Sequence, residues 1–199
     1  FLGMETYPSN LYDWRLIPET ALATATNGKV FVDNLGKFTE IRNKLSEYFP
    51  EDIRLNKIAT RCMKIAQSGQ YNFPRCMKRD ETVAARMAET EFIDEAVHMI
   101  YLLNRVYKPF YKWFHRRLKE LPILGEETHV MIGKLVKFPF DETYRKVEII
   151  EKICANIITE MKRQGVIEVI KSDFLLDYGP EIQASIKDEK LRNWSPWLD

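Results

Sequence analysis

The 199-residue sequence has few cysteines, no long apolar run and almost no net charge. Its three cysteines are odd in number and widely spaced, without a Cys-x-x-Cys pair, which argues against a disulfide framework and fits a reducing cytoplasm. No apolar stretch approaches the roughly 18 residues of a membrane span and no signal peptide is recognisable, so we expect neither membrane insertion nor export. Thirty basic and 29 acidic residues leave a formal charge of +1, which disfavours nucleic acid and membrane surfaces as partners.

The motifs of common enzymes are also missing. The chain contains no glycine-rich phosphate loop, no Gly-x-Ser-x-Gly elbow and no His-x-x-x-His pair. Its three histidines, His98, His115 and His129, are too dispersed to form a recognisable metal site. The sequence therefore predicts neither a common hydrolase nor a phosphate-loop enzyme.

Helical periodicity covers most of the chain. Apolar residues recur every three to four positions, and prolines and turn signals separate the runs. We expect an all-α fold, a helical bundle with a short irregular N-terminal segment and at most one or two short strands. Residues 1–17 form that segment, and residues 18–199 form the helical domain. Helices are expected over 18–26, 38–49, from 50 to a weak point at 68–69, 80–104, 107–122, 142–164 and 180–187.

Two boundaries in the middle of the chain depend on single residues. The second long helix weakens at Ser68 and Gly69, and Pro74 is expected to kink or restart it. Asp80 is placed to cap the next helix, which runs to Asn104 and is apolar on nearly every side in its second half. We therefore expect this helix to lie at the centre of the bundle.

One short segment has the pattern of a β-strand. Residues 29–33, with the sequence KVFVD, follow the turn signal Asn27-Gly28 and alternate as strands do. One short strand cannot form a sheet alone. This segment therefore either pairs with residues 166–170 or adds to a sheet that this chain does not contain.

Two stretches combine aromatic rings with cations: residues 70–79 read QYNFPRCMKR, and residues 107–117 read YKPFYKWFHRR. Such side chains offer charge-assisted hydrogen bonds and flat stacking surfaces, which suit a phosphate or a nucleotide-bearing partner. The other interpretation is that the aromatic rings form a stripe packed in the core and that the cations form a basic face in contact with solvent. The candidate binding residues are Tyr71, Asn72, Arg75, Lys78, Arg79, Lys112, Trp113 and Arg116.

A helical wheel separates the second stretch into two faces. The aromatic face carries Tyr107, Phe110, Tyr111, Phe114 and Leu118. The basic face carries Lys108, Lys112, His115, Arg116 and Lys119. Trp113 and Arg117 are four residues apart on a flank, close enough for the guanidinium to lie on the indole.

The expected central helix carries an acidic group. Glu91, Asp94, Glu95 and His98 fall within about a third of its circumference. Glu95 and His98 match the Glu-x-x-His spacing of carboxylate-bridged metal bundles, but no second copy of that motif occurs, so we expect no metal site. A solvated face or ion pairs with the basic stretches form one alternative. The other is a catalytic role, in which Glu91 or Asp94 orients an acceptor group or removes its proton.

Several longer runs resemble a known family. Between about residues 14 and 193 they include NGKVFVDNLGKFTEIR, YFPEDIRLNKIA, QSGQYNFPRCMKR and YLLNRVYKPFYKWFHRRLKELPILG. These runs resemble a bacterial and archaeal domain of unknown function that typically follows a nucleotidyltransferase core. The resemblance implies a helical C-terminal domain like that of aminoglycoside nucleotidyltransferases, with a nucleotide or a small-molecule acceptor as its ligand.

The catalytic motifs of such a protein are absent. The core would carry a Gly-Ser turn and an Asp-x-Asp pair that holds Mg²⁺, and this sequence contains neither. The resemblance therefore implies an accessory substrate-binding domain that is inactive alone and needs no cofactor, with residues 1–17 as the end of an upstream core and Mg²⁺ expected only with that core. The alternative is a noncatalytic interaction module that binds a protein or RNA partner, in which Trp194 and Trp197 add apolar contact.

Overall fold

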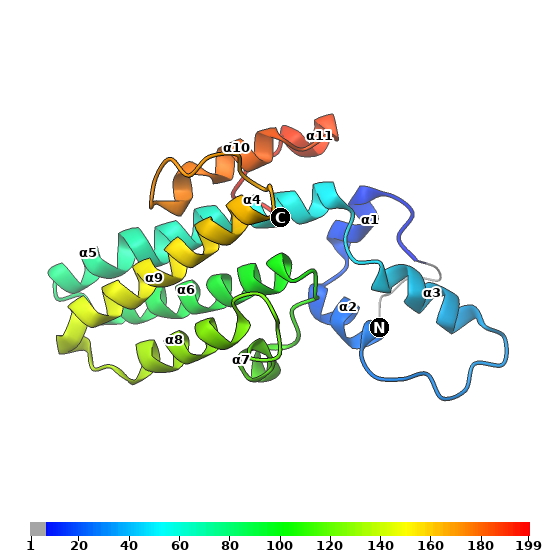
Figure 1. Cartoon of the computed structure of the whole chain (residues 1–199), viewed down its shortest axis with the longest axis horizontal. Helices are drawn as coiled ribbons and strands as arrows, with labels where there is room; N and C mark the ends of the chain where they lie inside the picture. Colours follow the sequence, from blue (N-terminus) through cyan, green and yellow to red (C-terminus); the bar gives the residue numbers. More distant parts are fainter. Residues whose placement is uncertain (1–6) are drawn as a thin grey trace.

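The computed structural model describes residues 7–199, and its regular secondary structure is helical (Figure 1). Within that range no strand occurs, so the predicted all-α fold is confirmed. The segment η1 is π-helical, and η2 and η3 are 3-10 turns. In chain order the elements are α1 (Leu11–Leu16), α2 (Glu19–Thr26), α3 (Lys37–Ser46), α4 (Glu51–Ile65), η1 (Ala66–Asn72), α5 (Phe73–Lys78), α6 (Thr82–Leu103), α7 (Tyr111–Leu118), α8 (Gly125–Lys137), η2 (Phe140–Glu142), α9 (Thr143–Arg163), η3 (Leu175–Asp177), α10 (Gly179–Ala184) and α11 (Glu189–Arg192).

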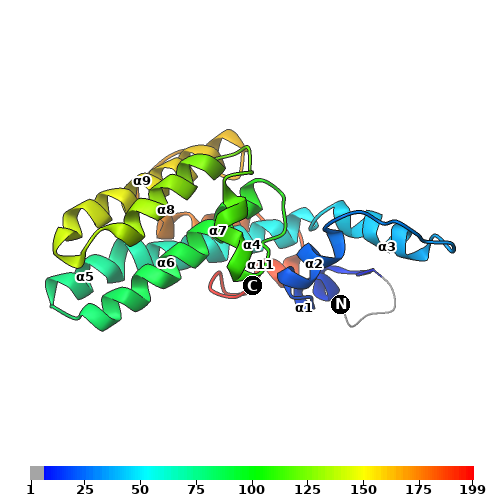
Figure 2. The ribbon, with the colours of Figure 1, turned by 90° about the horizontal axis from the view of Figure 1, so that it is seen from below.

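The larger part of the molecule is a helical bundle around α6. α4 and its continuation through η1 into α5 lie along α6, and α8 and α9 complete the bundle (Figures 1 and 2). Ala85, Ala88 and Ala96 of α6 are buried, and their small side chains let the neighbouring helices come close. Phe92 and Ile100 of the same helix are fully buried in this core. The central position predicted for this helix is confirmed.

A second, smaller core lies at the opposite end of the molecule from α5 (Figures 1 and 2). Residues of α1, α2, α3, the turn before α4 and the start of α4 form it together with Tyr107, Ile186 and Leu191. The rings of Phe49 and Tyr107 meet edge to face, with centroids 4.9 Å apart. The Tyr107 hydroxyl donates to the carbonyl oxygen of Leu45 at 2.7 Å, so the buried polar group has a partner. This core fixes the segment that leads into α7.

The chain continues as a helix through the weak point expected at residues 68–69. α4 runs through η1 into α5, and residues 66–72 form the wider turns of a π-helix. A Cβ atom on Gly69 would lie 2.2 Å from the ring of Phe92, so the close contact between η1 and α6 requires glycine. Pro74 lies in the first turn of α5. The restart expected at Pro74 is therefore a change of helix type within one continuous helix.

Neither segment expected to form a strand does so. Residues 29–33 belong to the connection between α2 and α3, whereas residues 166–170 follow α9. The two segments lie in different parts of the molecule, so the first of the two alternatives, that they pair with each other, is wrong (Figures 1 and 2). Without a neighbouring strand, the backbone of either segment has no ladder to join.

Several helix boundaries also differ from the prediction. α6 begins at Thr82, and Asp80 does not cap it but occupies a turn with a φ of 59°. α7 begins at Tyr111, after Pro109 and not around it. α8 is not predicted by the sequence pattern, because Gly125 resembles a helix end but opens this helix. The last predicted helix, 180–187, is shorter and is followed by α11.

The N-terminal segment is less irregular than its composition suggests. α1 is capped by Asn10, whose side-chain oxygen accepts hydrogen bonds from the N–H groups of Tyr12 and Asp13. Trp14 anchors this helix in the second core. Residues 1–6 of the segment lie outside the described residues. In residues 7–199, no helix combines the length and apolar character that crossing a membrane requires.

Candidate functional site

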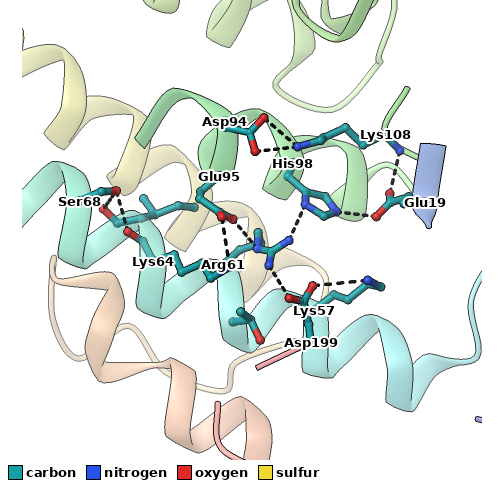
Figure 3. Close-up of polar contacts among 12 residues, drawn as sticks. Glu19, Lys57, Arg61, Lys64, Ser68, Asp94, Glu95, His98, Lys108 and Asp199 are labelled. Carbon is teal, nitrogen blue, oxygen red and sulfur yellow. Dashed lines mark hydrogen bonds and ion pairs between the residues drawn. The ribbon is translucent and has the colours of Figure 1, made fainter. Parts of the chain in front are cut away.

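Charged side chains are buried between α2, α4 and α6 (Figure 3). Arg61 of α4 is 4% exposed, and each of its three guanidinium nitrogens lies close to a polar side chain, through an ion pair at Nε and hydrogen bonds at Nη1 and Nη2. Nε lies 2.6 Å from Oε2 of Glu95, and Nη2 donates to Asp199 at 2.8 Å. Nη1 donates to Nδ1 of His98, whose other ring nitrogen contacts Glu19. We call Glu19, Arg61, Glu95, His98 and Asp199 the polar cluster.

The contacts of His98 define its protonation state. Arg61 can only donate, so Nδ1 of His98 accepts and the ring proton is on Nε2. Nε2 lies 2.7 Å from Oε2 of Glu19 and donates to that carboxylate. Burial lowers the pKa of His98 to about 4, against the attraction of Glu19 and with the help of the Arg61 cation. His98 is therefore neutral at pH 7 and links Arg61 to Glu19.

Glu19 connects the polar cluster to the residues before α7. Its Oε1 accepts the backbone N–H of Lys108 at 2.7 Å. Burial disfavours the Glu19 anion, but His98, Lys57 and this N–H outweigh burial and lower the pKa of Glu19 to about 2. Nζ of Lys108 in turn lies 2.8 Å from Oδ1 of Asp94 (Figure 3). The ion pair between the acidic face of α6 and the second cationic stretch, one of the two predicted alternatives, is therefore present at Asp94.

Glu91 and Asp94 line a shallow hollow on the exposed side of α6. The hollow has a volume of about 490 Å³, and its other lining residues are Arg86, Met87 and Thr90. Glu91 is exposed and forms no ion pair within residues 7–199. The structure thus places the two carboxylates in one open hollow, and their catalytic role stays a prediction.

The candidates of the first cationic stretch lie on η1 and α5. The guanidinium carbon of Arg75 is 4.5 Å from the centroid of the Tyr71 ring, which is a cation–π contact. Asn72 is half-buried, and the other candidates of this stretch are exposed. In the described part of the chain, Arg75, Lys78 and Arg79 form no ion pair. Their charges are therefore available to an anion.

The candidates of the second cationic stretch lie on α7, beside a pocket of about 410 Å³. We call it the α7 pocket; it is lined by Ala23, Thr24, Asn27, Pro109, Phe110, Trp113 and Arg117. Trp113 is 51% exposed, and Lys112 and Arg116 are also exposed. The guanidinium carbon nearest the Trp113 ring is that of Arg116, at 5.9 Å, instead of the predicted Arg117. Arg117 lines the pocket.

The aromatic face predicted for the second stretch is only partly buried. Tyr107 and Leu118 are buried, whereas Phe110 and Tyr111 are 50% and 62% exposed. The helical wheel assumes one helix from Tyr107 onward, but α7 begins at Tyr111, so the preceding residues are not in helical phase. Phe110 therefore lies in the wall of the α7 pocket.

α7 is attached to the bundle by few contacts. Leu118 is its one buried residue. The Tyr101 hydroxyl donates to the carbonyl oxygen of Phe114 at 2.9 Å, and Nδ1 of His129 donates to that of His115 at 2.9 Å. Nε2 of His115 donates in return to the carbonyl oxygen of His129 at 3.2 Å, and the two rings stack with centroids 4.2 Å apart. Side-chain hydrogen bonds thus join α7 to α6 and α8.

The structure places the two cationic stretches apart. α5 lies at one end of the bundle, while α7 lies beside α2, toward the other end of α6 (Figures 1 and 2). The 22 residues of α6 run between them and span about 33 Å at 1.5 Å per residue. Asp94 is connected to the second stretch through Lys108. The candidates on η1 and α5 therefore form a separate surface.

Sequence reasoning overlooked most of the polar cluster. Arg61 stands within the apolar stripe of Ile58, Cys62 and Ile65, and a cation in such a place needs a buried partner. That signal was available in the sequence. No local pattern points to Asp199, because its contact with Arg61 joins residues 138 positions apart. In residues 7–199, no three His, Cys, Asp or Glu side chains are grouped so that they could hold a metal ion.

The fold and site define an all-helical domain with a buried charged cluster and an aromatic, cationic pocket between α2 and α7. The family model described as domain of unknown function (DUF4037) matches residues 14–114, about half of the chain, and the chain belongs to this family. The matched region contains four of the five residues of the polar cluster, the first cationic stretch and most of the second. No curated protein and no solved structure gives a significant match.

Proposed function

We propose that this chain is the substrate-binding helical domain of a nucleotidyltransferase-like protein, and that it holds a nucleotide in the α7 pocket. The composition of this pocket carries the proposal. The rings of Phe110 and Trp113 share one hollow with the guanidinium of Arg117 and the amide of Asn27. Flat rings suit a nucleobase, and a guanidinium suits a phosphate. The resemblance to a domain that follows nucleotidyltransferase cores supports the transferase context.

The charges around the α7 pocket favour an anion. Lys112 and Arg116 lie on the same short helix as Trp113 and have no ion pair within the described residues. Arg117 has one weak ionic contact, 3.8 Å from Glu120, so most of its five donors remain open. A phosphate that enters the pocket would therefore meet the Arg117 guanidinium without first displacing a closely bound carboxylate.

The proposal assigns the transfer chemistry to an upstream core. Nucleotidyl transfer needs metal ions to clamp the attacking and leaving oxygens, and this sequence lacks the Asp-x-Asp pair of such cores. In the proposed assembly the core supplies Mg²⁺, and Glu91 or Asp94 orients the acceptor or removes its proton. The hollow that these two carboxylates line is open to a partner. The exposed cations of α5 would face the core or an anionic acceptor.

Nucleotide binding to the 199-residue protein tests the proposal. Titration calorimetry with the four ribonucleoside triphosphates should show saturable binding. Arg117→Gln should weaken it by roughly 1.5–3 kcal/mol, the usual scale of a charged hydrogen bond. Lys119→Ala is the matched control, because Lys119 is an exposed cation next to α7 that does not line the pocket. Absence of nucleotide binding, or equal affinity of the Arg117→Gln variant and the unchanged protein, would refute the proposal.

A second candidate function is a noncatalytic interaction module that binds a protein or RNA partner. The exposed apolar side chains of Phe31, Val32 and Leu35 favour a protein. Trp194 supports this function less than expected, because the Arg15 guanidinium covers its ring at 3.6 Å. Binding of single-stranded RNA with a steep salt dependence would favour the RNA version.

A further inference from the structure

The connection between α2 and α3 projects from the end of the molecule opposite α5 (Figures 1 and 2). We call residues 28–36 the arm. Phe31, Val32 and Leu35 of the arm are 90%, 77% and 82% exposed. Isolated apolar residues are common on protein surfaces, but three large ones within five positions mark an interaction site.

The backbone of the arm lacks partners as well. Within residues 7–199, the N–H and C=O groups of residues 29–32 make no hydrogen bond. The ends of the arm are fixed, because Arg42 donates to the carbonyl oxygens of Thr26 and Gly28, and Asp33 accepts the N–H of Thr39 at 2.7 Å. The arm therefore presents four consecutive residues with open backbone groups, as the edge strand of a sheet does.

The sequence of this segment is complementary to itself. When two copies of KVFVD are paired in antiparallel orientation about Phe31, Lys29 of one copy faces Asp33 of the other. Val30 then faces Val32, and Phe31 faces Phe31. Every direct pair is oppositely charged, β-branched or aromatic, and such pairs stabilise antiparallel ladders. If the pairing were centred on Val30 or Val32 instead, Phe31 of one copy would face the charged Lys29 or Asp33 of the other. The charged residues therefore specify the register.

We propose that residues 29–33 of two copies of this chain pair as an antiparallel ribbon and form a symmetric dimer. The arm lies at the tip of the molecule, so two copies can meet there without a clash between their bundles (Figures 1 and 2). A two-stranded ribbon alone is marginal in water, and Leu35 and the nearby Phe38, 52% exposed, add apolar surface to the contact. The dimer is therefore weak and depends on concentration. It does not depend on the proposed function.

Cross-linking through introduced cysteines tests the dimer and its register. In a Cys76→Ser background the remaining native cysteines are buried. Phe31→Cys then places two thiols directly opposite each other and should give a disulfide-linked dimer on mild oxidation. Val30→Cys is the matched control, because residue 30 faces residue 32. It should form a dimer only when mixed with the Val32→Cys variant. Self-cross-linking of Val30→Cys as efficient as that of Phe31→Cys would overturn the register.

Sedimentation equilibrium of the otherwise unchanged protein tests the charge pairing. Lys29→Glu replaces two Lys–Asp pairs per dimer by two like-charged pairs, so Kd should rise about tenfold. Lys37→Glu changes the net charge equally but lies outside the paired segment, and it should leave Kd unchanged. Equal effects of the two substitutions would overturn the proposal. So would a protein that stays monomeric up to millimolar concentration, as expected if the arm adds to the sheet of a different protein.

Discussion

Lysine and arginine side chains have different roles inside the bundle and on the exposed surfaces of α5 and α7. Arg54, Arg61 and Lys146 are 1%, 4% and 0% exposed, and each has an acidic partner. The exposed set has no ion pair within the described residues: Arg75, Lys78, Arg79, Lys112 and Arg116. A charge inside a protein must be paired because desolvation costs several kcal/mol. The three buried cations are therefore held by the fold, whereas the exposed set is open to a ligand.

Glu89→Ala should have the largest effect, because it removes the partner of a buried cation. Nζ of Lys146 lies 2.6 Å from Oε1 of Glu89 and 2.6 Å from the carbonyl oxygen of Leu135. Without Glu89 the buried ammonium keeps only uncharged partners, the Leu135 carbonyl and the face of the Phe140 ring at 4.9 Å. We expect the free energy of unfolding to fall by about 3–5 kcal/mol in urea denaturation.

The control for this prediction removes both charges. The double variant Glu89→Leu with Lys146→Met leaves no unpaired ion and should recover most of the lost stability. If Glu89→Ala lowered the free energy of unfolding by less than about 1 kcal/mol, the distinction between buried and exposed cations would not hold.

Acid should destabilise the polar cluster through His98. Its folded pKa of about 4 lies below the ordinary value of 6.5, so the unfolded chain takes up a proton first as the pH falls. The contribution of this pKa difference to the free energy of unfolding is fully present above pH 6.5. It falls by up to about 3 kcal/mol as the pH drops to 4. Urea unfolding at several pH values within that window measures the loss. The pKa values of Glu19 and Asp199 are also lowered, but the resulting losses begin at lower pH.

Two variants identify the group responsible for the pH dependence. His98→Gln should flatten the profile, since an amide does not titrate. Burial also lowers the pKa of His115, with its neighbour His129 acting in the same direction, so His115→Gln should flatten the profile less. A profile that keeps its slope in the His98→Gln variant would show that another group titrates in this window.

Arg75→Ala and Lys112→Ala should have the smallest effect on stability. Both side chains are exposed and have no ion pair within the described residues, so we expect the free energy of unfolding to change by less than about 0.5 kcal/mol. If these side chains meet phosphate, Lys112→Ala should weaken binding of a nucleotide at α7, and Arg75→Ala should weaken binding of another anion at the separate surface of η1 and α5, each by roughly 1.5–3 kcal/mol in calorimetry. Unchanged affinity together with a lower melting temperature would assign both residues to the fold.

Local periodicity predicted most of the helices but few of the contacts. The long helices α6 and α9 follow from apolar repeats that are visible within one window of sequence. α8 was missed because Gly125, which usually ends a helix, here follows Leu124 in the left-handed region with a φ of 58°. Trp113 and Arg75 are exposed, and the binding role inferred for them from composition stays a prediction. The α7 pocket could not be predicted, because Asn27 and Arg117 meet only in the folded chain.

The attachment of α7 has a consequence for local opening of the molecule. A helix held by one buried leucine, the partly buried Phe114 and a few side-chain hydrogen bonds can separate at a part of the free energy that global unfolding requires. The core around α6 does not need to open with it. α7 carries Lys112, Trp113 and Arg116, so in such an opening these side chains would move together as one unit. A ligand that contacts α7 and α2 at once would hold this unit closed.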